Sequence, residues 1–242
     1  CYTSWCGPCK YMTETIFPQE KAGEFFNPKF VCVKFDMEKG EGPELAKRFG
    51  VRAYPTFLIL RPDGTVQHKI VGGGDLDKFI AKVEKGLNEK TSLDYLNKIH
   101  EKGKMNKKQL MTYSVVLNEA YEKDKSEKVG KELDAVLKEK DKMKKEYWPI
   151  LERSPYGSDN FKLVLNNIGT FNKNIGKENV DKYLTSCYKN AINNTMRPNT
   201  KEPLKVLQQI QEELTKLDLA DQATLTRSLE LNQACLEKTS IK

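Results

Sequence analysis

The sequence lacks any apolar run of about twenty residues, the length that a helix needs to cross a lipid bilayer. Its first residues also lack the basic and apolar stretches of a secretory signal peptide, although a chain that begins at Cys1 could have lost a leader with whatever preceded it. We therefore expect no membrane span. The 242 residues, of which 38% are hydrophobic, are enough to bury real cores and predict two domains.

Cysteine and histidine are scarce, which limits the disulfide and metal chemistry open to the chain. Six cysteines in this length are too few for a disulfide framework, and the two histidines have no nucleophile nearby in sequence. A zinc site at Cys6 and Cys9 would need two further ligands at similar spacing, whereas Cys32, Cys187 and Cys235 lie singly along the sequence. We therefore expect no metal and no cofactor.

Charge of one sign is not concentrated in any segment. The formal net charge is +7 and the pI is near 8.9, but the excess is mostly lysine mixed with 34 acidic residues. Interleaved runs such as LKEKDKMKKEY, residues 137–147, are typical of solvated helix faces, and no recognised DNA- or RNA-binding motif accompanies them. We therefore expect no nucleic acid partner.

Up to about residue 90, helical and strand patterns alternate. Pro18 should interrupt the helix that follows Cys9, because proline lacks the amide hydrogen and clashes with the preceding turn. Alternating apolar residues predict a strand over 29–36, and Asp75 can cap a helix. The other expected elements are a helix at 42–50 and two hairpin strands at 55–60 and 65–71, joined by the turn RPDG at 61–64.

The motif WCGPCK at residues 5–10 resembles the active-site signature of the thioredoxin family. AYPTFLILRPDG, at 53–64, resembles the family's segment that carries a cis-proline before an antiparallel hairpin. CKYMTETIFPQE, at 9–20, is similar to the reductant-passing thioredoxin-like domains of bacterial envelopes. The resemblance implies an α/β thioredoxin-like fold, truncated at its N-terminus, over residues 1–90. An all-α, helical-repeat-like domain is expected at 91–242.

The family's fold also implies a central strand that leads directly into the cysteine pair, between the strand at 30–36 and the one at 55–60. Only Cys1 to Thr3 could be the tail of that strand. A sheet without its middle strand would leave two rows of backbone groups unpaired in the interior, which is costly. We therefore expect residues upstream of Cys1 in the natural protein, or a neighbouring chain that donates the strand.

In the family's chemistry, the first cysteine attacks and the second resolves. Cys6 should lie at a helix N-terminus, where free amides and the helix dipole favour its thiolate. It would form a mixed disulfide with a client protein, and Cys9, one turn later, would resolve it. Gly7 and Pro8 set the turn, and this pair resembles the reducing members, with potentials of about −200 to −270 mV. The implied activity is that of a protein-disulfide reductase or isomerase.

Five further residues are implied in client binding. The peptide bond into Pro55 is expected to be cis and to face the cysteine pair, while the backbone of Tyr54 hydrogen-bonds the incoming peptide. Trp5 is expected as a lid beside the first cysteine, with scaffold packing as the alternative. Gly72 and Gly73 belong to VGGGD, which lacks the lysine and hydroxyl residue of a phosphate loop and is expected to border the redox site.

The other cysteines are expected to be structural. Cys1 fits a core position at a strand end, with a third redox thiol as the alternative. Cys32 in the predicted strand, Cys187 on a helical stripe and Cys235 are expected to be small buried hydrophobes.

From about Lys90 onward the pattern is helical only. Apolar stripes at helical spacing recur, and breakers at 101–106, 153–160 and 196–203 separate them. We expect about seven or eight helices stacked as repeat-like pairs, without a tetratricopeptide signature. A concave face of this array would bind a peptide or partner protein. Alternatively, the helices only support the first domain or mediate self-association.

Two classes of function stay open. The first is an enzyme that exchanges disulfides with protein clients and receives electrons from an upstream dithiol donor. The second is a non-catalytic protein-binding scaffold that uses the helical array. The presence of both cysteines in their motif favours the enzyme. The resemblance favours a bacterial periplasm or cell envelope, whereas the cysteines outside the pair would suit a reducing cytoplasm.

Overall fold

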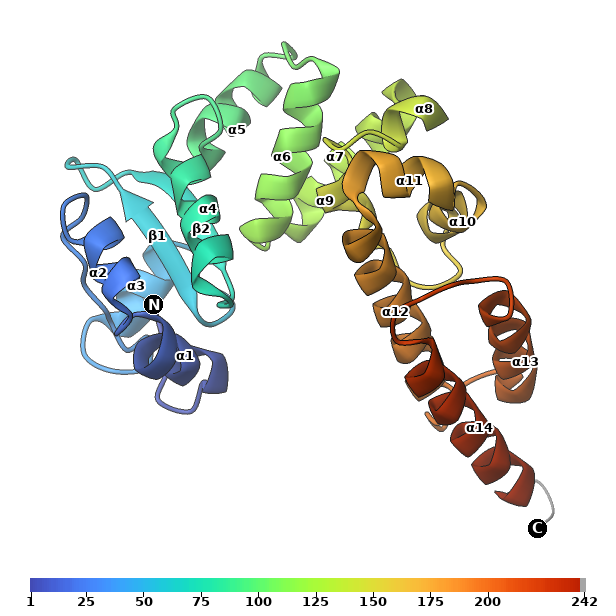
Figure 1. Cartoon of the computed structure of the whole chain (residues 1–242). Helices are drawn as coiled ribbons and strands as arrows, with labels where there is room; N and C mark the ends of the chain where they lie inside the picture. Colours follow the sequence, from blue (N-terminus) through green and yellow to red (C-terminus); the bar gives the residue numbers. More distant parts are fainter. Residues whose placement is uncertain (240–242) are drawn as a thin grey trace. The chain divides into compact units, whose positions relative to one another are not determined.

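The computed structural model describes residues 1–239 and divides the chain into two compact units, Cys1–Leu137 and the residues from Lys138 onward (Figure 1). The first unit combines helices with a β-hairpin, whereas the described residues of the second form helices and their connections. The predicted fold class, an α/β domain followed by a helical region, is therefore confirmed.

The first unit begins with the helix that carries the cysteine pair. α1 (Gly7–Tyr11) continues into a π-helical turn, η1 (Met12–Ile16), and then α2 (Glu20–Phe26) and α3 (Gly42–Arg48) follow. The predicted interruption at Pro18 is confirmed, because this residue lies between η1 and α2.

The predicted hairpin is also confirmed. β1 (Thr56–Leu60) and β2 (Val66–Val71) pair antiparallel, with the first residue of β1 opposite the last of β2 and a register irregularity near the turn. Asp63 closes the turn, because its Oδ1 accepts hydrogen bonds from the backbone and the hydroxyl of Thr65. Gly64 has a φ of 79°, a conformation that costs glycine little.

α4 (Leu76–Leu87) packs its apolar face against β2 (Figure 1). Asp75 caps the helix as predicted, since its carboxylate accepts hydrogen bonds from the first-turn amides of Asp77 and Lys78 at 3.0 and 3.2 Å. The buried side chains of this core come from the first helices, β2 and α4: Met12, Ile16, Ala22, Ile70, Leu76, Phe79 and Val83.

Replacing the cap residue tests how far α4 depends on it. We expect Asp75→Ala to lower the free energy of unfolding by about 1 kcal/mol, because two first-turn amides lose their acceptor. Asp75→Asn keeps an acceptor and should unfold close to the wild type. Urea unfolding followed by circular dichroism measures both, and equal losses in the two variants would contradict the capping role.

The predicted strand over 29–36 is wrong. In this segment only Asp36 forms a bridge, parallel to Tyr2, and the side chains of Val31 and Val33 are 95% and 72% exposed. Two backbone hydrogen bonds make up this bridge: Tyr2 N–H donates to Phe35 O, and Met37 N–H donates to Tyr2 O. Alternation predicts an extended segment, but a strand also needs a paired neighbour, which residues 31–34 do not find within residues 1–239.

The same segment accounts for one wrong burial prediction. Cys32 is exposed, since the strand that it was predicted to belong to does not form. Cys235 is exposed as well, because it lies on the outer face of a C-terminal helix rather than on its apolar stripe. Cys187 is buried as predicted, and Cys1 is half-buried with its backbone paired to Thr56.

Three helices complete the first unit: α5 (Leu93–Glu101), α6 (Lys107–Glu119) and α7 (Lys123–Val136). Both α5 and α6 pack against β2, and α7 packs against α6 (Figure 1). The compact unit therefore reaches Leu137, well beyond the last strand, which ends at Val71.

Polar contacts tie these helices to the hairpin and α4. Lys85 pairs with the buried carboxylate of Glu119 at 2.7 Å, and Lys69 pairs with Glu122. The fully buried ring of His68, on β2, accepts the N–H of Leu93 at its Nδ1, at 3.0 Å. The junction is thus held by charges and a histidine as well as by apolar packing.

The second unit contains seven helices within its described residues, listed in chain order: α8 (Glu139–Lys142), α9 (Trp148–Leu151), α10 (Asp159–Asn166), α11 (Ile168–Ile175), α12 (Lys177–Asn194), α13 (Pro203–Leu214) and α14 (Gln222–Thr239). α12 packs against α11, α13 and α14, and the two long helices α12 and α14 lie side by side (Figure 1). Its core is rich in buried aromatic residues: Trp148, Phe161, Phe171, Tyr183 and Tyr188.

The predicted helix-breaking segments coincide with helix ends. Each of them contains the end of one helix, the start of the next or the connection between the two: 101–106, 153–160 and 196–203. The described residues beyond 90 contain ten helices rather than seven or eight. The excess comes from α8 and α9, which have four residues each and are too short to produce a periodic apolar pattern. None of the helices in residues 1–239 has the length and apolarity to cross a membrane.

Candidate active site

The cysteine pair forms a disulfide at the start of α1. The two sulfurs of Cys6 and Cys9 are 2.06 Å apart, their Cα atoms are 5.2 Å apart, and both residues are buried. Cys6 is the N-cap of the helix, and its Sγ accepts a hydrogen bond from the N–H of Cys9 at 3.1 Å. When the pair is reduced, that amide and the helix N-terminus favour a thiolate at Cys6.

Gly7 and Pro8 lie between the cysteines on the exposed side of the helix start. Pro8 lies in the first turn, where its missing N–H costs nothing. A Cβ added at Gly7 would meet no atom within 4 Å, so the space beside Gly7 is open, whereas both cysteines are buried. The turn between the two cysteines is therefore on the surface of the first unit.

The peptide bond between Tyr54 and Pro55 is cis, as predicted. Pro55 is buried, and its carbonyl oxygen accepts a hydrogen bond from Gly72 N–H at 2.8 Å. Gly72 has a φ of 88°, which a residue with a side chain rarely adopts. The structure thus joins two of the predicted client-binding residues, Pro55 and Gly72, through one backbone hydrogen bond.

The loop at 72–74 lies against the helix of the cysteine pair. A Cβ at Gly73 would come within 2.7 Å of the side chain of Met12 and 3.7 Å of the carbonyl oxygen of Pro8. Gly74 N–H approaches Met12 Sδ at 3.4 Å. Met12 was not among the predicted site residues. Met12 follows Cys9 by three residues and so lies on the same helix face, a spacing that could have identified it as a site residue.

Trp5 is 66% exposed, and two neighbours hold its indole. Its Nε1 donates a hydrogen bond to Glu38 Oε1 at 2.9 Å. Its ring also meets the ring of Tyr54 edge-on, with centroids 6.1 Å apart and planes at 82°. Sequence reasoning missed Glu38, because no motif connects it to a tryptophan 33 positions earlier. Trp5 and Tyr54 therefore form an aromatic pair between the CXXC motif and the cis-proline.

Within residues 1–239, no three His, Cys, Asp or Glu side chains are grouped so that they could hold a metal ion. The site therefore consists of a buried disulfide at a helix start, with Trp5 directly before Cys6 in sequence and in edge-on contact with Tyr54, which precedes the cis-bonded Pro55. Such a pair can accept electrons from one dithiol and pass them to another disulfide.

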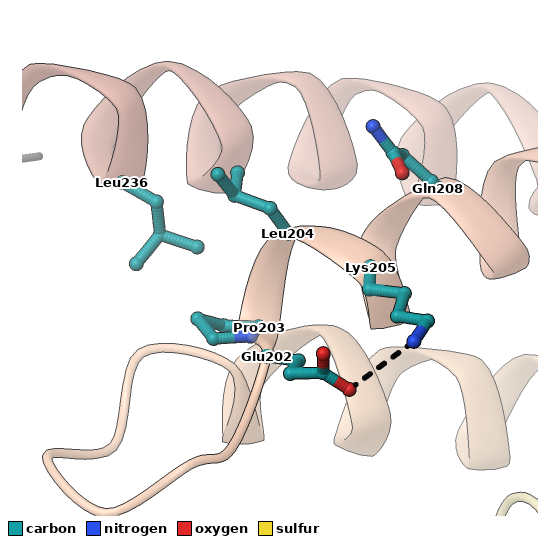
Figure 2. Close-up of a pocket in the computed structure, with 6 residues that line it drawn as sticks. All are labelled: Glu202, Pro203, Leu204, Lys205, Gln208 and Leu236. Carbon is teal, nitrogen blue, oxygen red and sulfur yellow. Dashed lines mark hydrogen bonds and ion pairs between the residues drawn. The ribbon is translucent and has the colours of Figure 1, made fainter.

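A separate cavity of about 530 Å³ lies between the start of α13 and α14 in the second unit (Figure 2). Pro203, Leu204 and Leu236 form its apolar part, while Glu202 pairs with Lys205 at 3.3 Å at its edge. Gln208 completes the lining. None of these six residues is a nucleophile for disulfide exchange, so the cavity has no chemistry in common with the cysteine pair.

Comparison with known proteins finds the thioredoxin family model at residues 1–85. "Thioredoxin-1" of Drosophila melanogaster is 37% identical over 76 residues, which cover 28% of this chain and 66% of that protein. "Thioredoxin F-type, chloroplastic" of Mesembryanthemum crystallinum is 40% identical over 83 residues, covering 34% of this chain and 40% of that protein. "Thioredoxin M-type, chloroplastic" of Chlamydomonas reinhardtii is 32% identical over 87 residues, covering 36% and 58%.

The chain thus spans between 40% and 66% of the length of these curated relatives. The match to the family model ends at residue 85, before α5 begins. No solved structure matches this chain significantly.

Proposed function

Because residues 1–85 of this chain form a domain of the thioredoxin family, we propose that the protein is a thiol–disulfide oxidoreductase that acts on client proteins. The observation that carries the proposal is the Cys6–Cys9 disulfide at the N-terminus of α1. The cis peptide bond before Pro55 supports it, since this bond belongs to the same resemblance as the CXXC motif.

The reaction begins with the reduced pair. The Cys6 thiolate attacks one sulfur of a client disulfide, forms a mixed disulfide and releases the other client sulfur as a thiolate, which takes up a proton. The thiolate of Cys9 then attacks Cys6 Sγ, which releases the second client thiolate and closes the Cys6–Cys9 disulfide. Two electrons have passed to the client, and an upstream dithiol donor must return two to the pair.

The direction of transfer in this proposal is towards reduction or isomerisation of the client. Its support is the Gly7-Pro8 dipeptide, which resembles the reducing members of the family. For the compartment we propose a bacterial periplasm or envelope, supported by the likeness of residues 9–20 to envelope domains.

A second candidate function is protein binding by the helical unit, alone or in support of the redox domain. The observation that favours it is that the residues from Lys138 onward form a compact unit with its own aromatic core and an apolar cavity. As a scaffold, this unit would bind a peptide or partner protein, with stacked helix pairs as the surface.

Insulin reduction by dithiothreitol, followed as precipitation of the free B chain, tests the enzyme. We expect catalytic amounts of the protein to accelerate precipitation. Alkylating the oxidised protein blocks only the cysteines outside the disulfide and should leave the activity, whereas alkylation after reduction should abolish it. No acceleration by the untreated protein would favour the scaffold, and activity after complete alkylation would exclude the cysteine pair.

A further inference from the structure

The thioether of Met12 lies in the core of the first unit and binds a backbone group of the loop at 72–74. The residue is 1% exposed, and its Sδ accepts a hydrogen bond from Gly74 N–H at 3.4 Å. An aliphatic side chain could fill the same space but would leave this N–H without the sulfur acceptor. The sulfur therefore adds a contact with the loop that apolar packing alone does not supply.

The helix that carries the cysteine pair fixes the position of Met12. Cys9, Met12 and Ile16 are buried along one face of α1 and η1, at spacings of three and four residues. Met12 begins the π-helical turn, in which its carbonyl oxygen accepts the N–H of Phe17 at 2.9 Å. The sulfur is thus attached to the backbone about one helical turn beyond Cys9.

The loop at 72–74 is held on both sides. At one end, Gly72 N–H donates to the carbonyl oxygen of Pro55 at 2.8 Å, and at the other, Gly74 N–H donates to Met12 Sδ. Between them, the backbone groups of Gly73 have no hydrogen-bond partner within residues 1–239. The loop therefore links the cis-proline to the helix of the cysteine pair, and its central residue can pair with an extended client segment.

Gly73 shows how closely Met12 and the loop fit together. A Cβ at this residue would lie 2.7 Å from Met12 Cγ and 2.8 Å from Met12 Sδ, closer than unbonded atoms of these types approach. The φ of Gly73 is not positive, so space rather than backbone conformation requires glycine here. Met12 thus occupies the volume that a side chain at position 73 would take.

We propose that Met12 is a positioning residue of the redox site, whose thioether holds the loop at 72–74 against α1 so that the loop and Pro55 together guide a client segment to the disulfide. This inference rests on the proposed function. Because one end of the loop is bound to Pro55 and the other to Met12, the sulfur contact sets where the loop lies relative to the cysteine pair. Met12 acts through the loop backbone and takes no part in the exchange of sulfurs.

Leucine at position 12 removes the acceptor and nearly preserves the apolar volume. We expect Met12→Leu to raise the KM for insulin about two-fold, the low end for one net hydrogen bond, at unchanged kcat. Met37→Leu is the matched control, because this methionine is also buried in the first unit but lies in the segment before α3. It should keep the KM of the wild type, and dithiothreitol should reduce the Cys6–Cys9 disulfide at the same rate in all three proteins.

The amide proton of Gly74 reports the anchoring without any client. In nuclear magnetic resonance spectra, its signal should shift in Met12→Leu and its exchange with solvent should become faster, because the acceptor is lost. Met37→Leu should leave both the shift and the exchange rate of this proton unchanged.

Alanine at position 73 tests the close fit between the loop and Met12. Its Cβ would displace the Met12 side chain, so we expect Gly73→Ala to raise the KM about five-fold, the scale of mild overpacking. In Met12→Ala, which lacks Cγ and Sδ, adding Gly73→Ala should raise the KM no further. Urea unfolding shows whether Met12→Ala folds, and if it does not, Met12→Leu and the Gly74 amide decide.

Four results would overturn the proposal: an unchanged KM in Met12→Leu, an equal KM increase in Met37→Leu, a Gly74 amide that is the same in Met12→Leu as in the wild type, or additive effects of Met12→Ala and Gly73→Ala. Failure of the wild type to reduce insulin would count against the oxidoreductase instead. The Gly74 amide would then still show whether Met12 holds the loop.

Discussion

Serine at position 6 should abolish insulin reduction, whereas serine at position 9 should capture the client. In Cys6→Ser no thiolate remains at the helix start to attack, so turnover should fall at least about 10³-fold, the scale of losing a nucleophile. In Cys9→Ser the attack proceeds, but the mixed disulfide at Cys6 has no resolving sulfur and should accumulate.

Non-reducing electrophoresis and mass spectrometry measure the captured species. Cys9→Ser should show a covalent adduct with the client that dithiothreitol releases, and Cys6→Ser should show none. Cys32→Ser is the matched control, because this exposed cysteine lies outside the disulfide and its replacement should leave turnover unchanged. An adduct that persists in Cys6→Ser would mean that another thiol attacks, and the assignment of roles would be wrong.

Acidification should loosen the first unit through His68. Burial of the ring, and secondarily the positive charge of Lys85, lower the pKa of His68 to about 4 from its usual value near 6.5. The structure explains why protonation of the ring is unfavourable. Nδ1 must remain unprotonated to accept the N–H of Leu93, and Nε2 has no hydrogen-bond partner among the described residues. A protonated ring would need acceptors at both nitrogens.

The sign of the effect follows from the lowered pKa. Between about pH 6.5 and 4 the unfolded chain binds a proton that the folded chain does not, so stability is complete above that window and declines through it. The lowered pKa corresponds to about 3 kcal/mol.

Urea unfolding at pH 7 and pH 4 measures the loss, with His68→Asn as the control. Asparagine retains an acceptor for Leu93 but does not titrate, so the difference between the two pH values should be about 3 kcal/mol smaller than in the wild type. Parallel pH profiles of the two proteins would show that His68 is not the group responsible.

The hairpin and the cap of α4 could be predicted because local chemistry decides them, whereas the cis bond at Pro55 was implied by the family resemblance. Asp63 and Gly64 specify the turn, Asp75 specifies the helix start, and the cis bond follows from a recognised motif. The segment 29–36 failed for the opposite reason. Its alternation is correct for a strand, but pairing depends on a neighbour that is distant in sequence.

The candidate site shows the same division between local and distant contacts. The disulfide follows from the spacing of Cys6 and Cys9, whereas the hydrogen bond from Trp5 to Glu38 joins residues that only the folded loop brings together. Met12 lies between these cases, because its position after Cys9 is local but its contact with Gly73 is not.

The junction between the hairpin and α5–α6 determines where the protein can be cut. A fragment that stops at residue 90 would lack Glu119, the partner of Lys85, and Leu93, whose N–H donates to His68. It would also expose to water the face of β2 on which α5 and α6 pack. A fragment that stops after Leu137 keeps every one of these contacts. A fusion protein that carries this thioredoxin-family domain should therefore also include α5, α6 and α7.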